Sequence, residues 1–212
     1  MNNDVALNLA HIRKKLGKAR LVAVSKMQPD EAVEAALAAG QRVFGENRVQ
    51  EAQERWVPRR AAYPDLGLHL IGPLQTNKVK EAVALFDVIE TLDREKLALA
   101  LAAEMQKQGR ALPCFIQVNT GDEAQKAGIA PAALPDFLEF CRGECGLTIA
   151  GLMCIPPVDD PPALHFALLR KLALRHGLTG LSMGMSADYE KALALGATHV
   201  RVGSGVFGAR NY

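Results

Sequence analysis

The sequence LVAVSKMQPDEAVEAALAAG, residues 21–40, decides the fold, because it holds one complete strand-and-helix unit. The apolar run at its start predicts a buried strand over residues 21–25. Pro29 then stands near the first position of a helix, and Gly40 follows the last turn as a C-terminal cap. This stretch therefore predicts a strand that leads directly into a helix.

The same unit recurs along the chain. Short apolar runs alternate with helical segments as far as residue 202, and a helix over residues 5–16 precedes the first run. The predicted strands are residues 21–25, 42–44, 68–71, 87–90, 114–118, 147–151, 180–182 and 199–202. The later predicted helices are residues 29–40, 48–62, 76–85, 93–109, 131–141, 161–177 and 186–196, with Asp93 and Ser186 as N-terminal caps.

This alternation predicts how the strands pair. Each helix must return the chain to the same end of the sheet, so neighbouring strands run parallel. Eight such units close into a barrel, and we therefore expect an α/β fold, a single (β/α)8 TIM barrel in one domain over residues 1–212. A doubly wound open sheet is the alternative if the strand count differs by one or two.

Composition limits the classes of function. The 212 residues are 49% hydrophobic and 23% charged with a net charge of +2, which is typical of a soluble globular domain. Basic runs such as residues 13–15 are too short to indicate nucleic-acid binding, and the longest apolar run, residues 97–103, is too short to span a bilayer. We recognise no signal peptide, and the four cysteines form no CxxC pair. We therefore expect a cytoplasmic protein with no membrane, nucleic-acid or metal partner.

Lys26 directly follows the first predicted strand. In a TIM barrel this is the end of the strand at which active sites lie. Burial lowers the pKa of a lysine readily, and the neutral amine can attack a carbonyl group. Lys26 is therefore a candidate for forming an imine, although the local sequence alone favours a lysine that extends its ammonium to solvent, so the rest of the chain must decide.

Two glycine-serine loops follow the last two predicted strands. They are SMGMS, residues 182–186, and VGSG, residues 202–205. Loops at these two strands form the recurrent phosphate site of the TIM barrel, where backbone amides and hydroxyl groups bind the anion. We predict phosphate contacts from Ser182, Gly184, Gly203 and Ser204; ordinary turn glycines are the alternative.

Further polar groups are expected at the same edge of the barrel. Arg201 alternates with two valines along the eighth strand, so it points either into the barrel mouth or outward as a surface arginine. Asn47 follows the second strand and could direct its amide at a ligand. The loop over residues 151–157 is apolar and could cover a planar ring, while residues 69–78 end in polar groups that include Lys78. A phosphate, an aldehyde for Lys26 and an aromatic nitrogen for Arg201 occur together in pyridoxal 5′-phosphate (PLP).

Several motifs then point to one family. AVSK, FGEN with VQE, HLIGPLQTNK, GLM-IPP, LSMGMS and RVG---FGAR resemble the YggS/PROSC (PLPBP) pyridoxal-phosphate homeostasis proteins, and the resemblance runs from about residue 20 to residue 212. It implies a single alanine-racemase-like barrel that carries PLP on a lysine, here Lys26. It also implies that the phosphate lies against residues 182–184, which include Met183, and against Gly203 and Ser204. The pyridine nitrogen would face Arg201, and Asn47 would lie close to the ring.

The sequence departs from the family pattern at two positions. Ser204 stands in a Gly-Ser-Gly run where a Gly-Thr pair is more usual, but it keeps a hydroxyl group. Met27 follows the lysine where threonine is common. Neither change affects the amine of Lys26.

The resemblance implies a function in PLP homeostasis, in which the protein buffers PLP and delivers it to apoenzymes. We expect no catalytic residue, because an arginine at the pyridine nitrogen opposes its protonation and weakens the electron sink. A racemase is the main alternative, but it needs a second proton-transfer group, and Tyr63, Tyr189 and Tyr212 all lie outside the predicted strand-end loops. A cofactor-free enzyme that forms a Schiff base on Lys26 is a weaker alternative. We expect a monomer or a weak dimer.

Overall fold

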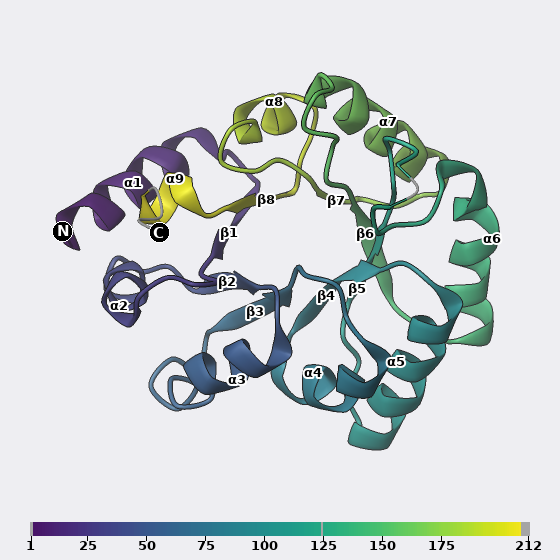
Figure 1. The fold of residues 1–212 in the computed structure, drawn as a ribbon, viewed down its shortest axis with the longest axis horizontal. Coiled ribbons are helices and arrows are strands. Elements are labelled where there is room, and N and C mark those ends of the chain that lie inside the picture. Colours follow the sequence, from purple (N-terminus) through teal and green to yellow (C-terminus); the bar gives the residue numbers. More distant parts are fainter. Residues whose placement is uncertain (1, 124, 209–212) are drawn as a thin grey trace.

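Eight parallel strands close into a barrel within residues 2–123 and 125–208, which are the residues that the computed structural model describes. The strands follow one another around the barrel in chain order (Figure 1). The last pairs with the first, so that Arg20 lies opposite His199 and Ala23 opposite Val202. This pairing confirms the TIM barrel and excludes the open sheet. The strands are β1 (Arg20–Val24), β2 (Val43–Glu46), β3 (Gly67–Leu70), β4 (Val88–Leu92), β5 (Cys114–Gln117), β6 (Ile149–Met153), β7 (Gly180–Ser182) and β8 (His199–Val202).

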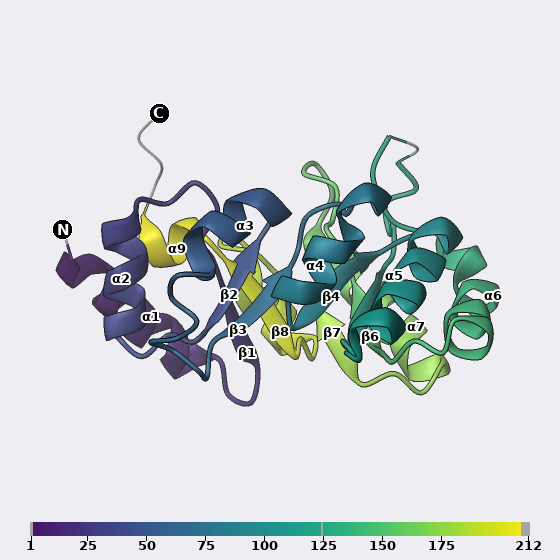
Figure 2. The same ribbon diagram turned by 90° about the horizontal axis from the view of Figure 1, so that it is seen from below.

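The helices surround the strands as an outer layer (Figure 1). Figure 2, turned by 90°, shows the strands running through the middle of the molecule between the helices. The helices are α1 (Asn2–Lys15), α2 (Asp30–Ala38), α3 (Val49–Trp56), α4 (Val79–Leu85), α5 (Glu95–Gln108), α6 (Leu134–Glu139), α7 (Pro162–Arg175), α8 (Tyr189–Ala194) and α9 (Ser204–Phe207). Shorter helical turns are η1 (Thr76–Lys78), η2 (Pro131–Ala133) and η3 (Phe140–Glu144).

Helix α5 illustrates why the sequence folds in this way. Leu97, Leu101 and Met105 recur at a spacing of four residues, and all three are buried against the barrel. Gly109 ends the helix with a φ of 63°, a left-handed conformation that glycine adopts without strain. The apolar spacing and the glycine together fix the face and the end of this helix.

Both predicted N-terminal caps are wrong. Helix α5 begins at Glu95 after the extended residue Arg94, and the carboxylate of Asp93 accepts a hydrogen bond from the Arg94 side chain at 2.6 Å instead. Helix α8 begins at Tyr189, three residues after Ser186. Both side chains bind partners outside the helix that they were expected to cap.

Several element boundaries differ from those predicted, and three of them have a clear physical reason. Strand β2 extends to Glu46, because it pairs with β3 over its whole length. Strand β6 begins at Ile149, since the Leu147 amide donates to the Cys141 carbonyl at 2.9 Å and so belongs to the turn after η3. Helix α3 ends at Trp56, and the residues up to 62 form turns.

The interior has two parts of different chemistry. Between the barrel and the helices the packing is apolar, as in the contact between the Phe44 and Trp56 rings at 4.5 Å. Inside the barrel, Glu90 of β4 and Ser182 of β7 form a hydrogen bond, and these strands are not neighbours, so the contact crosses the barrel. The barrel interior therefore holds buried polar groups directly below the end of the strands that carries Lys26.

In the described residues, no helix has the length and hydropathy that crossing a membrane would require.

Candidate functional site

A cavity of about 560 Å³ opens at the carboxyl ends of the strands. This volume lies within the usual range for small-molecule sites. Five of the residues singled out from the sequence line it, namely Lys26, Asn47, Arg201, Gly203 and Ser204. The other lining residues are Val24, Ile71, Ile155, Met185, Ser186 and Ala187.

Lys26 lies in a tight turn that follows β1. The Gln28 amide donates to the Ser25 carbonyl at 3.1 Å, which closes the turn around Lys26 and Met27. Lys26 is half-buried and lines the cavity, whereas the Met27 side chain is 66% exposed. Met27 also has a φ of 59°, which is uncommon for a residue other than glycine. The lysine therefore enters the cavity from a turn of unusual backbone conformation.

Two backbone amides converge at the side of the cavity formed by β8. The amides of Gly203 and Gly205 both donate to the Ser186 hydroxyl oxygen, each at 3.2 Å. Amides that share one oxygen acceptor form the kind of cradle that holds an oxygen of a phosphate group. Ser186 and Ser204 both line the cavity, so these groups lie at the edge where the sequence predicted a phosphate site. The sequence offered Ser186 as the second serine of SMGMS, but we assigned it to a helix cap.

Ser182, Met183 and Gly184 do not line the cavity. Ser182 is fully buried; its hydroxyl donates to Glu90 Oε2 at 2.6 Å and accepts from Arg201 Nη1 at 2.5 Å. Met183 is also fully buried. The structure therefore gives the Ser182 hydroxyl a different role from the expected phosphate contact, because strand β7 carries its side chain into the barrel interior.

Gly184 shapes the loop through its lack of a side chain. Its φ is 91°, and an added Cβ would lie 2.5 Å from Ala192 Cβ, closer than such atoms approach. Its carbonyl also accepts a hydrogen bond from the Arg201 amide at 2.9 Å. Gly184 thus lets the loop after β7 pack between α8 and the strand that carries Arg201.

We expect Gly184→Ala to lower the free energy of unfolding by about 3 kcal/mol, the sum of backbone strain and overpacking. Gly196→Ala is the matched control, because Gly196 has the same φ of 91° but a Cβ added there would lie 3.8 Å from its nearest neighbour, the Arg170 Nε. This control should lose only about 1–2 kcal/mol through strain. Urea unfolding of both variants gives the comparison, and equal losses would show that the Ala192 contact is unimportant.

Arg201 points into the barrel. The residue is only 4% exposed, so it is not the surface arginine of the alternative interpretation. Its Nη2 donates to the Cys154 carbonyl at 2.8 Å, and its Nη1 donates to Ser182. These two bonds fix the position of the guanidinium of Arg201, which lines the cavity.

Glu90 is the buried carboxylate beneath Arg201. Its Oε1 lies 2.5 Å from His69 Nδ1, and its Oε2 lies 3.9 Å from Arg201 Nη1. Burial alone would raise the pKa of Glu90, but the hydrogen bond and charge of His69, the charge of Arg201 and the Ser182 hydrogen bond outweigh it and lower the pKa to about 2. Glu90 therefore stays ionised and balances the charge of Arg201.

Neither Glu90 nor His69 was singled out from the sequence. The sequence did carry one signal for Glu90. A carboxylate within an apolar strand costs free energy to bury unless it is paired. His199 lies close to this network, with its ring centroid 5.8 Å from that of His69. Burial lowers the pKa of His199 to about 4, so its imidazole is neutral at pH 7.

Apolar side chains and Asn47 form the remaining walls. Ile155, from the loop that was expected to cover a planar ring, lines the cavity together with Ile71. Gly72 lies so close to the Asn47 backbone that an added Cβ would be 2.3 Å from the Asn47 carbonyl oxygen. This close approach fixes Asn47 at the boundary with a second cavity of about 550 Å³, which Lys78 lines.

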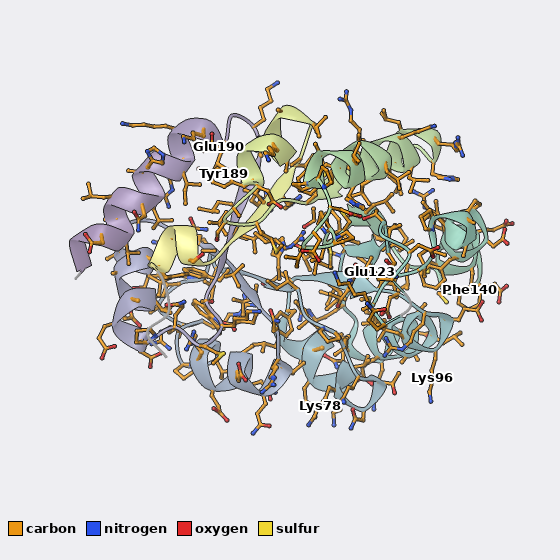
Figure 3. The ribbon with its side chains drawn as sticks, turned by 45° about the horizontal axis from the view of Figure 1, so that its top comes forward. Lys78, Lys96, Glu123, Phe140, Tyr189 and Glu190 are labelled. Atoms are coloured by element: carbon orange, nitrogen blue, oxygen red, sulfur yellow. The ribbon has the colours of Figure 1, made fainter. Side chains whose placement is uncertain are left out.

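Lys78 is the second lysine that the sequence predicts at this end of the barrel. Its Nζ lies 4.0 Å from Glu81 Oε1, and its side chain is 45% exposed. Figure 3 shows it at the periphery of the molecule, on the side opposite to Tyr189. Lys78 does not line the cavity that contains Lys26.

The tyrosines that could serve a racemase are absent from the cavity lining. Tyr189 begins α8, next to Glu190, which pairs with Lys15 of α1 at 2.7 Å (Figure 3). Tyr63 packs under the Arg42 guanidinium, with 5.0 Å between that group and the ring centroid. Tyr212 lies outside the described residues. Within the described chain, therefore, no tyrosine faces Lys26 across the cavity.

The cysteines form no disulfide, and all four are free. Burial raises the pKa of the Cys114 and Cys154 thiols to about 12, so both stay protonated at pH 7. Among the residues described by the structure, no group of three or more histidine, cysteine, aspartate or glutamate side chains is placed to hold a metal ion.

Comparison with known proteins gives consistent matches over almost the whole chain. The family model for the alanine racemase N-terminal domain matches residues 3–211. The pyridoxal phosphate homeostasis protein of Vibrio cholerae is 41% identical over 230 residues, covering 99% of this chain and 98% of the relative. The protein of the same name from Escherichia coli K12 is 36% identical over 234 residues, with the same two coverages of 99% and 98%.

Solved structures agree with these sequence matches. The structure of PipY from Synechococcus elongatus without PLP has a TM-score of 0.90 and 40% identity, and covers 96% of this chain and 100% of PipY. The PLP-bound structure of PipY has a TM-score of 0.87 and 39% identity over the same shares of the two chains. An alanine racemase of Clostridium difficile, 13% identical with a TM-score of 0.77, shares the fold; the match covers 99% of this chain and 58% of the racemase.

Proposed function

Because this chain belongs to the alanine racemase N-terminal domain family, and within it to the pyridoxal phosphate homeostasis proteins, we propose that it holds PLP reversibly as a Schiff base on Lys26. Residues 1–212 then act as one PLP-binding domain. The protein buffers the intracellular pool of PLP and passes the cofactor to apoenzymes.

One observation carries this proposal, namely the convergence of three binding groups on one cavity. Lys26, Arg201 and Gly203 line it, and the Gly203 and Gly205 amides both donate to the hydroxyl of Ser186, which also lines it. PLP needs an amine for its aldehyde, a donor for its ring nitrogen and a cradle for its phosphate. The residues present fit all three needs, and the apolar walls suit the ring.

The chemistry of attachment follows from Lys26. When bound, PLP supplies an aldehyde that condenses with amines. The Lys26 amine would condense with that aldehyde, so that a C=N bond replaces the C=O bond and one water molecule leaves. The condensation is reversible, so an incoming amine or water releases the cofactor.

The charges around the cavity favour holding PLP over catalysis. Arg201 can only donate hydrogen bonds, so it opposes protonation of the ring nitrogen. Glu90 contacts Ser182 and Arg201 but does not line the cavity, and its partners keep it ionised. Carbanion chemistry therefore receives little support from these groups.

The test of this proposal is the absorbance spectrum of the purified protein before and after borohydride reduction. We expect a PLP band that shifts on reduction, and peptide mapping should find the reduced PLP on Lys26. Colourless protein with no spectral change on adding PLP would contradict the proposal and favour a cofactor-free Schiff-base enzyme.

A second measurement separates a carrier from an enzyme. The loaded protein is incubated with a set of L-amino acids in deuterium oxide, and α-deuteration is followed by mass spectrometry. We expect no exchange above the rate with free PLP. Stereospecific deuteration, or formation of the D-isomer at enzyme-like rates, would instead identify a racemase.

The proposal also covers location and assembly. The four free cysteines are typical of a reducing compartment and support a cytoplasmic location. We propose PLP-dependent apoenzymes as the recipients and a monomer or weak dimer as the assembly.

A further inference from the structure

The turn that carries Lys26 is held at both ends by one arginine from outside the cavity. Arg55 of helix α3 donates from Nη1 to the Ser25 carbonyl and from Nη2 to the Gln28 carbonyl, the latter at 2.6 Å. These two carbonyls belong to the first and last residues of the turn. The planar guanidinium therefore bridges the turn, with Lys26 between its two contacts.

The turn needs this support because of Met27. A φ of 59° costs free energy for a residue that has a Cβ, and such a conformation persists only when its surroundings impose it. The Met27 side chain is largely exposed, so burial of that side chain contributes little. The Arg55 bridge supplies the restraint that the side chain of Met27 does not.

Arg55 is itself held by two carboxylates. Its Nη1 lies 3.7 Å from Glu46 Oε1, and its Nε lies 3.7 Å from Asp30 Oδ1. Glu46 is almost fully buried, and its Oε1 accepts hydrogen bonds from Ser25 Oγ at 2.7 Å and from Trp56 Nε1 at 3.0 Å. One buried carboxylate thus joins the residue before Lys26 to the helix that carries Arg55.

We propose that Arg55 is a positioning residue that directs the Lys26 amine into the cavity by bridging its turn. Arg55 does not line that cavity; it lines a separate one of about 320 Å³ on the other side of the turn. It therefore acts through the backbone of Lys26 and not by contact with a ligand. This inference rests on the proposed function, since PLP is the ligand to which the amine is directed.

The central experiment compares Arg55→Lys with a matched control, Arg60→Lys. Arg60 makes the same kind of bridge elsewhere, donating to the Leu66 carbonyl at 2.8 Å and the Leu85 carbonyl at 2.6 Å. Lysine keeps the positive charge in both variants but cannot reproduce the planar two-point contact. Any general loss of packing should therefore appear in both variants. A loss of Lys26 positioning should appear only in Arg55→Lys.

Two ligands separate positioning of the amine from integrity of the cavity. PLP can bond to Lys26, whereas pyridoxine 5′-phosphate has no aldehyde and binds only through non-covalent contacts. In Arg55→Lys we expect the PLP affinity to fall about tenfold while that for pyridoxine 5′-phosphate changes less than about twofold. Arg60→Lys should leave both affinities within about twofold of wild type. Equal losses for the two ligands in Arg55→Lys, or no loss of PLP affinity, would overturn the inference.

Placing Arg55→Lys in a Met27→Gly background tests whether Arg55 acts on the turn. In this background the turn also does not depend on the Arg55 bridge for folding. Glycine adopts a φ of 59° without strain, so the turn forms there without support. The tenfold penalty of Arg55→Lys on PLP affinity should shrink to about threefold in this background. A penalty of the same size in both backgrounds would show that Arg55 acts in some other way.

Failure of the proposed function is recognised separately. If wild-type protein does not attach PLP to Lys26, the proposed function fails and PLP affinity is no longer informative. The inference is then judged on PLP-free protein, by the pH dependence of Lys26 acetylation with trace acetic anhydride. We expect Arg55→Lys to change the acetylation rate of Lys26 at least about threefold without altering that of Lys78. Unchanged acetylation of Lys26 would overturn the inference even if PLP binding had failed.

Discussion

Lys26→Ala is expected to abolish covalent attachment of PLP and to weaken PLP binding about a hundredfold, or about 2.7 kcal/mol. Alanine has no amine, so the bond to the aldehyde cannot form. The Gly203 and Gly205 amides and Arg201 remain, and they should retain weak, non-covalent binding. Titration with PLP, followed by absorbance and by calorimetry, measures both effects.

Lys78→Ala is the control for this experiment. Lys78 lies at the same end of the barrel but lines the adjoining cavity, so its loss should leave the PLP spectrum unchanged. If borohydride still fixes PLP to the Lys26→Ala protein by an internal bond, the assignment of the lysine is wrong. If Lys78→Ala abolishes attachment, Lys78 takes its place.

The second large effect concerns stability. Glu90→Gln should lower the free energy of unfolding by about 3 kcal/mol and the melting temperature by roughly 6–12 °C. The substitution keeps the shape of the side chain but leaves the Arg201 charge buried without its carboxylate. Asp65→Asn is the control, because Asp65 pairs with Arg42 at an exposed position and its loss should cost less than about 1 kcal/mol.

The stability difference between wild type and Glu90→Gln should depend on pH. The pKa of Glu90 falls from an ordinary value of 4.5 to about 2 in the folded protein. A lowered folded-state pKa means that the ionised carboxylate stabilises the fold at pH values above 4.5. This contribution is lost as the pH falls from 4.5 toward 2, so the two proteins should converge in that window. A difference that stays constant between pH 7 and pH 3 would show that Glu90 acts through packing rather than charge.

The sequence predicted the barrel well because its strand-and-helix pattern is local. Each of the eight strands lies within two residues of its predicted start and end. The pattern also predicted which residues follow each strand, and that placed Lys26, Asn47 and Gly203 at one end of the barrel. These predictions needed only the order of elements and the rule that parallel strands share one carboxyl edge.

The parts that escaped prediction depend on contacts between distant residues. Ser182 was expected to bind phosphate, but its partner Glu90 is 92 residues away and crosses the barrel interior to reach it. Ser186 was assigned to a helix cap, but it accepts from amides that come from the loop after β8. Arg55 carried no signal at all, because nothing local indicates that a helix residue holds the turn of another unit.

The cavity forms only when the barrel closes. Lys26 follows the first strand and Gly203 follows the eighth, and these strands pair although nearly the whole chain separates them. Bringing them together closes one of the longest loops in the fold, so this pairing is expected to form late on entropic grounds. During synthesis on the ribosome, a nascent chain that lacks β8 presents Lys26 without Arg201 and Gly203, which line the same cavity. The cavity is therefore lined from both sides only when the first and last strands meet.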